Sequence, residues 1–179
     1  MKDVKDFNKK ISKIEYNSLN LPSKLQFSEG HMAEYGYDGA GRKLSVAYTT
    51  SKTNLLVPMG SIVPPQSTNV AMTLKIDYCG NMIYENEKLS RILTDVGYIT
   101  FDGMTPMYHY YLKDHLGNNR VVMNERGAVE QVNHYYTFGG LMGESTGGEE
   151  QPYKYNGKEL DRMHGLDWYD CGPRHYDAT

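Results

Sequence analysis

The sequence predicts an all-β protein, a YD-repeat-like meander of short antiparallel strands with little helix. Sixteen tyrosines and eighteen glycines in 179 residues favour twisted strands with frequent turns, because aromatic residues are enriched in strands and glycine supplies the positive φ of tight turns. Two spacings recur along the chain, Tyr-x-Tyr and Asp-x-x-Gly. The first places two rings on one sheet face, and the second marks a hairpin turn.

The turn signal is clearest in residues 108–139. Asp114 and Asn124 each stand three residues before a glycine, Gly117 and Gly127 respectively. An Asp or Asn side chain accepts a hydrogen bond from the backbone two residues on, and the glycine takes the left-handed position after a type I turn. This stretch is therefore expected to form three strands joined by two turns.

The same pattern occurs once near the N-terminus. Tyr35 and Tyr37 are two residues apart and share a sheet face, Asp38 starts the turn, and Gly41 takes the left-handed position. Arg42 begins the return strand, where its guanidinium stacks on a tyrosine or pairs with a carboxylate.

The remaining elements follow from apolar alternation and from turn residues. Residues 1–10 are charged and lack an apolar stripe at helical period, so they are expected to form an N-terminal tail. Residues 53–73 contain Pro58, Pro64 and Pro65 and are expected to form a Pro-rich loop. Further strands are expected at residues 11–16, 25–27, 74–78, 82–84, 89–93 and 96–101.

The motifs resemble those of RHS or YD-repeat proteins. Residues 114–120, Asp-His-Leu-Gly-Asn-Asn-Arg, are similar to the "DHLGxxR" opening of the RHS repeat-associated core. Residues 136–139, Tyr-Thr-Phe-Gly, resemble its "YxPFG" segment, and residues 35–44 resemble the "YxYDxxGRL" repeat unit. The end of the chain resembles "YxFxGKExD…GLxxYGARxYDP", with Cys171 and Pro173 where the family has Tyr and Ala.

The resemblance implies three parts, a tail at 1–10, degenerate YD repeats at 11–107, and an RHS repeat-associated core segment at 108–179. Its motifs carry a structural role and no catalytic one. The residues to which it assigns that role are Tyr35, Tyr37, Asp38, Gly41, Arg42, Asp114, His115, Gly117, Arg120, Gly127, Phe138, Gly139, Gly157, Tyr169, Arg174 and Tyr176.

The function implied by the resemblance is that of a non-enzymatic scaffold. Relatives wind such strands into a hollow shell that encloses a C-terminal toxin or effector, secreted or placed at the cell surface. The implied partners are flanking RHS repeats and that toxin or effector. Since the family continues with further motifs, the chain is expected to be a stretch of shell truncated at both ends. Two alternatives stay open: a carbohydrate-binding surface module, because exposed tyrosine rows with nearby Asn, Asp and Arg can bind sugars, and a hydrolase that uses the histidines and aspartates.

Other classes of site find little support. None of the six histidines has a metal-ligand spacing or stands beside a nucleophile motif, so no catalytic, metal or cofactor site is expected. With a net charge of −3 and scattered basic residues, no nucleic-acid partner is expected. No apolar run approaches the ~18 residues of a membrane span, and the N-terminus carries no signal peptide. Cys79 and Cys171 are expected to be unpaired thiols.

Overall fold

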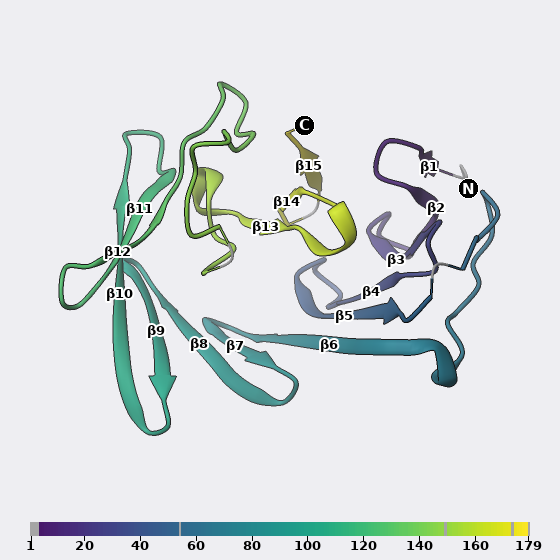
Figure 1. Ribbon diagram of the computed structural model, residues 1–179, viewed down its shortest axis with the longest axis horizontal. Coiled ribbons are helices and arrows are strands. Elements are labelled where there is room, and N and C mark those ends of the chain that lie inside the picture. Colours follow the sequence, from purple (N-terminus) through teal and green to yellow (C-terminus); the bar gives the residue numbers. More distant parts are fainter. Residues whose placement is uncertain (1–3, 54, 149, 173, 179) are drawn as a thin grey trace. The chain divides into compact units, whose positions relative to one another are not determined.

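The computed structural model describes residues 4–53, 55–148, 150–172 and 174–178 (Figure 1). Those residues form strands and three short 3₁₀ turns, with no α-helix among them, which confirms the all-β class. The strands of the main meander are β1 (Val4–Asp6), β2 (Ile11–Tyr16), β3 (Pro22–Phe27), β4 (Met32–Tyr37), β5 (Lys43–Ser51), β6 (Val70–Cys79), β7 (Met82–Glu85), β8 (Lys88–Thr94), β9 (Gly97–Asp102), β10 (Thr105–Lys113), β11 (Asn119–Asn124) and β12 (Val129–Val132). The smaller elements are β13 (Glu159–Asp161), β14 (Trp168–Asp170), β15 (His175–Asp177), η1 (Ser67–Asn69), η2 (Tyr155–Gly157) and η3 (Met163–Gly165).

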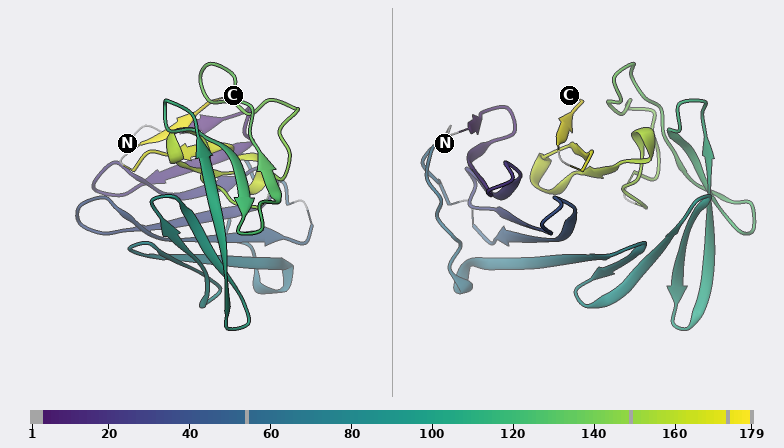
Figure 2. Two further views of the ribbon diagram at one scale, coloured as in Figure 1. Left: turned by 90° about the vertical axis from the view of Figure 1, so that its left-hand side faces the viewer. Right: turned by 180° about the vertical axis from the view of Figure 1, so that it is seen from behind.

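Hydrogen-bonded neighbours follow sequence order. In the described residues β1 to β12 form one meander in that order, and β13 to β15 form a second sheet. Because each strand turns directly back on the one before it, the pairings are antiparallel, and colours in Figure 2 change step by step from strand to strand within each unit. The predicted meander is therefore present.

The chain divides into two compact units. The first contains the residues up to Cys79 together with Tyr84–Lys88 and Met163–Leu166. The second contains Gly80–Ile83, Leu89–Arg162 and the residues from Asp167 onward. The boundary expected at residue 107 falls inside β10.

The first unit has a mainly apolar core, in which Ser12, Gln26 and Ser51 are buried polar members. Side chains from β2 to β5 alternate between this core and solvent; in β4, Ala33 and Tyr35 are buried whereas Glu34 is exposed. Burial of each large aliphatic side chain contributes roughly 1.5–3 kcal/mol. The buried apolar residues are Ile11, Ile14, Leu21, Leu25, Phe27, Met32, Ala33, Tyr35, Val46, Tyr48, Val57 and Leu166.

The second unit has a core that is largely polar. Val122, Tyr98, Leu160 and Tyr169 are its buried apolar members on named strands from β9 onward. Beside them lie buried amide side chains and one buried lysine, a composition that is unusual for a protein interior. These polar residues are Asn118, Asn119, Gln131, Asn133, Gln151 and Lys154.

The N-terminal tail was predicted wrongly for the described residues. Val4–Asp6 form β1, with Val4 opposite Ile14 and Asp6 opposite Ile11. Asp6 Oδ1 accepts the backbone N–H groups of Asn8 and Lys9 at 2.9 and 3.1 Å, which returns the chain to β2. A strand held by such a turn and by a backbone ladder needs no apolar stripe of its own.

The Pro-rich loop ends earlier than expected. Strand β6 begins at Val70, because its pairing with β5 continues to Ser51 opposite Val70. Before it, the loop is fastened to the first sheet by the N–H of Val57, which donates to Ser28 O at 2.9 Å, and by the N–H of Gly60, which donates to Ser12 O at 2.8 Å. Among the described residues, no helix has the length and apolar character to cross a membrane.

Candidate functional site

The turn at Asp114 has the predicted geometry. The N–H groups of Leu116 and Asn118 donate to Asp114 Oδ1, each at 3.0 Å, and the N–H of Gly117 donates to Asp114 O at 3.0 Å. Gly117 has a φ of 83°, the left-handed conformation that a β-branched residue adopts poorly. The carboxylate of Asp114 thus organises the whole turn.

The other two predicted turns are built in the same way. Gly41 and Gly127 have φ values of 80° and 79°, and the side chains of Asp38 and Asn124 each accept two backbone N–H groups. Arg42 pairs with a carboxylate, since its Nε donates to Asp38 Oδ2 at 2.7 Å. The backbone N–H of Arg42, then its side chain, lower the pKa of Asp38 below the usual value.

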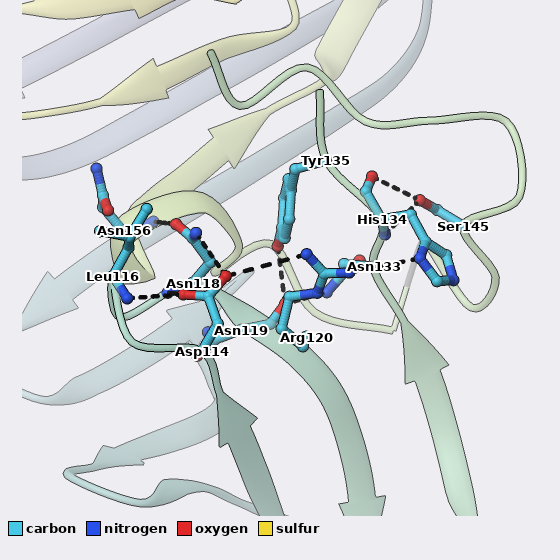
Figure 3. Close-up of polar contacts among 10 residues, drawn as sticks. All are labelled: Asp114, Leu116, Asn118, Asn119, Arg120, Asn133, His134, Tyr135, Ser145 and Asn156. Carbon is cyan, nitrogen blue, oxygen red and sulfur yellow. Dashed lines mark hydrogen bonds and ion pairs between the residues drawn. The ribbon is translucent and has the colours of Figure 1, made fainter. Parts of the chain in front are cut away.

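The Asp114 turn is tied to a distant segment (Figure 3). Asn118, which is buried, donates from Nδ2 to Asp114 Oδ2 at 2.8 Å and accepts the N–H of Asn156 on Oδ1 at 2.8 Å. Burial raises the pKa of the Asp114 carboxyl, but bonds from the side chain and backbone of Asn118 and the backbone of Leu116 outweigh it and lower this pKa. The carboxylate therefore stays charged while it holds both segments.

The next residue, Asn119, joins β11 to two other segments of the second unit. Its Nδ2 donates to Tyr153 O at 2.7 Å, and its N–H donates to Lys154 O at 3.1 Å. Its carbonyl oxygen accepts Asn133 Nδ2 and the Tyr135 hydroxyl, each at 2.8 Å. Asn119 is completely buried, and its side chain is bonded through Nδ2, whereas its Oδ1 is buried without a hydrogen-bond partner among the described residues.

Arg120 completes the motif. Its guanidinium lies over the Tyr135 ring at 5.6 Å, 4.0 Å from Asp114 Oδ2 and 3.5 Å from His134 Nδ1. Ser145 lies beside His134, but its hydroxyl bonds the backbone N and O of that residue at 3.0 and 3.2 Å and not its ring. This serine and histidine therefore form no nucleophile–base pair.

An amide ladder runs through the same core. Gln151 Nε2 donates to Gln131 Oε1 at 2.8 Å, and Gln131 Nε2 donates to Asn133 Oδ1 at 3.1 Å. Lys154 Nζ donates to Gln151 O at 3.0 Å. In a low-dielectric interior such bonds are strong when complete and costly when one partner is missing.

The C-terminal motif meets the segment that contains Phe138 and Gly139. The hydroxyl of Tyr169 donates to Gly139 O at 2.9 Å, and that of Tyr176 donates to Phe138 O at 2.8 Å. A Cβ on Gly139 would lie 2.6 Å from the ring of Tyr155, so only glycine fits there. The structure thus brings four of the predicted motif residues together through two hydrogen bonds.

Other predicted residues lie apart from these contacts. His115 is exposed, and Gly157, with a φ of 64°, closes η2. Arg174 is exposed, and its carbonyl accepts the N–H of Cys171 at 3.0 Å. Pro173, the other departure from the family's C-terminal motif, lies outside the described residues.

In the first unit, the rings of Tyr35 and Tyr37 stack with centroids 6.5 Å apart, and the Tyr37 hydroxyl donates to Pro22 O at 3.0 Å. Both of the sequence's cysteines, Cys79 and Cys171, are exposed and unpaired.

One polar relay was missed from the sequence. His109 Nδ1 lies 2.6 Å from Glu130 Oε2, and its Nε2 lies 2.8 Å from Thr100 Oγ1. The order Thr-His-Glu is that of a general-base relay. However, His109 is only 8% exposed, and Tyr98 stacks on its ring with centroids 4.3 Å apart, so a substrate has little access to the imidazole. The three residues come from three strands, so their spacing in the sequence forms no recognisable motif. The signal that could have indicated the position of His109 was its pairing with Tyr98 across β9 and β10.

The second unit has a small hollow beside the C-terminal motif, lined among others by Gly139, Leu160 and Tyr169. Its volume of about 130 Å³ is smaller than the ~300–1,000 Å³ of typical ligand pockets. Among the residues that the structure describes, no group of three His, Cys, Asp or Glu side chains has the geometry to hold a metal. The contacts of the motif residues are with the chain itself, as in a structural site.

Comparisons with known proteins give a match at the level of structure. No family model and no curated protein matches the sequence. The crystal structure of TcdB2-TccC3-TEV is similar over 93% of this chain, with a TM-score of 0.64 and 15% identity, and that of TcdB2-TccC3-Cdc42 over 98%, with a TM-score of 0.63 and 14% identity. A Photorhabdus luminescens Tc holotoxin pore with a mutation in TccC3 is similar over 93% of the chain, with a TM-score of 0.59 and 16% identity.

The chain spans only 8% to 9% of the length of the proteins that it matches. At these identities the likeness concerns the fold. This chain therefore has the fold of a short stretch of the TcdB2-TccC3 structures, a long antiparallel meander without α-helices in the described residues.

Proposed function

We propose that the chain is a wall segment of an RHS-type shell, a non-enzymatic scaffold that in the whole protein encloses and delivers a C-terminal toxin or effector. The observation that carries the proposal is the similarity of 93% of the chain to TcdB2-TccC3-TEV at a TM-score of 0.64. The RHS-like motifs of the sequence add to it, because they lie on the turns and contacts that hold the meander together.

The polar contacts support a structural role. Asp114, Asn118 and Asn119 each make a side-chain hydrogen bond to backbone groups of their own chain. A binding or catalytic site would leave such groups aimed at a ligand. These residues instead align strands, as the wall of a shell requires.

The partners that follow from this proposal are flanking RHS repeats and the enclosed toxin or effector. The place of action would be outside the producing cell or on its surface. Exposed apolar side chains on β9 and β10 would then face other parts of the wall or the cargo, and they include Phe101, Tyr108, Tyr110 and Leu112.

The test is isolation of the protein from its source organism with an affinity tag at the chromosomal locus. A shell segment should be recovered in a large hollow particle, visible by electron microscopy, with a polypeptide inside that resists added protease until the particle is unfolded. An untagged strain is the control for non-specific capture. Recovery as a small particle without protected contents would contradict the proposal.

A second candidate is a carbohydrate-binding module. Tyr108 and Tyr110 lie on the same face of β10 and are 42% and 41% exposed, which is the arrangement of rings that stack on sugars. A glycan array with the wild type and with Tyr108→Ala/Tyr110→Ala would test it. Binding that the double substitution removes would favour this module over the shell.

A further inference from the structure

The segment Met163–Leu166 packs into the first unit through one histidine. The His164 ring stacks on His31, with centroids 4.4 Å apart and planes at 19°, and meets Phe27 edge-on at 5.2 Å and Tyr48 at 6.4 Å. Two residues on, Leu166 is completely buried. The segment is therefore held by a ring inserted among side chains of β3, β5 and the turn that precedes β4.

The imidazole of His164 lacks a polar partner where it is buried. Its Nε2 is shielded from water and has no hydrogen-bond partner in the described part of the chain. The backbone of His164 is left-handed, with a φ of 56°. An unsatisfied polar atom and a left-handed non-glycine residue both cost free energy, so packing of the neutral ring must offset them.

The charged and titratable groups around this ring are His31, Glu29, Lys10 and Tyr48. His31 Nδ1 accepts the N–H of Ser51 at 3.1 Å, so a proton at that nitrogen would break the bond. Glu29 Oε2 lies 4.0 Å from His31 Nε2, while its other oxygen is paired with Lys10 Nζ at 2.6 Å. A positive charge added to this stack by protonation would therefore be only partly compensated, because Glu29 is already paired with Lys10.

We propose that His164 and His31 form an acid-released latch: the neutral, stacked pair holds Met163–Leu166 on the first unit, and protonation of His164 releases the segment. The proposal stands independently of the function proposed above. It rests on the stack, on the buried and unpartnered Nε2, and on the buried Leu166 that the ring fastens.

The direction of the pH dependence follows from the environment. Burial, and then the neighbouring His31, lower the pKa of His164 to about 4 from 6.5. The docked segment thus binds its proton less readily than the released one, so docking is fully stable above about pH 6.5 and weakens as the pH falls toward 4. In that window the population of the released segment should rise by at most about tenfold for each unit by which the pH falls. The rise should be smaller than this limit because the ring is partly solvated.

Hydrogen exchange measured by NMR on the whole chain tests the latch. The N–H of Leu166 donates to Met163 O at 3.1 Å, so its exchange reports whether the segment is docked. After correction for the intrinsic rate, we expect exchange of this amide to accelerate about tenfold or more between pH 7.5 and 5, with the amide of Leu25 unchanged. Equal corrected rates at the two pH values would overturn the proposal.

Two histidine variants complete the test. His164→Asn fits the left-handed backbone and removes the titrating ring, so the pH dependence should vanish, whereas His115→Asn, at an exposed histidine of the second unit, should keep it. Persistence in His164→Asn would refute the latch. If the segment is released at every pH in that variant, the pKa of His164 is measured by NMR titration of the wild type. A pKa near 6.5 while the segment stays docked would also refute the latch.

Discussion

The two units share a strand-and-turn plan but fill their interiors with different chemistry. In the first, Ile11, Leu25 and Val46 are completely buried and carry no polar side-chain atom. In the second, Asn119 and Gln131 are buried to the same extent. The first unit also buries Ser12 and Gln26 completely, but the second buries more amide side chains. The comparison shows that a meander of Asp-x-x-Gly turns does not dictate how its strands are held together.

The difference concerns specificity as well as stability. Apolar side chains repack against new neighbours with modest loss, provided volume is conserved. An amide ladder such as Gln151, Gln131 and Asn133 is satisfied in one register alone, because a slip of one residue turns each side chain to the other face. In the first unit the buried Gln26 bonds to His31 O and to the N–H of Val63. We infer that strand alignment depends more on buried hydrogen bonds in the second unit and more on packing in the first.

The largest predicted effect is in the apolar core. Leu25→Ala leaves a cavity in a fully buried position and should lower the free energy of unfolding by about 2–5 kcal/mol. Urea unfolding followed by circular dichroism measures it, with Leu19→Ala, at a 47% exposed position, as the control near zero. A loss below about 1 kcal/mol would mean that this core is not packed as described.

The polar core should respond differently. Gln151→Leu removes the donor to Gln131 Oε1 and the acceptor of the Tyr153 N–H, at 2.8 and 2.6 Å, and should destabilise by about 1–3 kcal/mol. Adding Gln131→Leu should cost less than the sum of the two single changes, since neither glutamine then leaves the other's bond unsatisfied. Trp168 fluorescence during urea unfolding measures the second unit; strict additivity would show that the ladder is not cooperative.

The contrast also explains what the sequence could predict. The turns at Asp38, Asp114 and Asn124 were predicted because their chemistry is local: a side-chain acceptor and a glycine three residues later are enough. The strand at Val4–Asp6 was missed, since its formation depends on a pairing with β2 that its own residues do not announce.

The site shows the same limit. The motif residues Asn118 and Asn119 were visible in the sequence, but their partners Asn156 and Tyr153 lie 38 and 34 residues away. The relay of Thr100, His109 and Glu130 joins three strands in the same manner. Such contacts follow from strand register, which depends on bulges and on long-range pairs that a single sequence does not specify.

A third prediction separates turn geometry from packing. Gly117→Val should destabilise by more than ~1 kcal/mol, because φ is 83° and valine is poorly tolerated there. A Cβ at Gly117 meets no atom within 4 Å, so the cost is in the backbone alone. Gly143→Val is the matched control, with equally open surroundings and no left-handed φ; equal effects of the two changes in thermal unfolding would show that the turn does not need its glycine.

The smallest effect tests whether single hydroxyls hold the C-terminal motif. Tyr169→Phe deletes the donor to Gly139 O in a position only 1% exposed, and it should cost about 1 kcal/mol because the buried carbonyl loses its partner. Tyr176→Phe deletes the donor to Phe138 O at an exposed contact, where water replaces the hydroxyl, so its cost should stay below about 0.5 kcal/mol. Both losses are read from the urea midpoint of Trp168 fluorescence. If Tyr169→Phe is as mild as Tyr176→Phe, the second unit is held at this end by the packing of aromatic rings, and the contrast between the two cores does not extend to the C-terminal sheet.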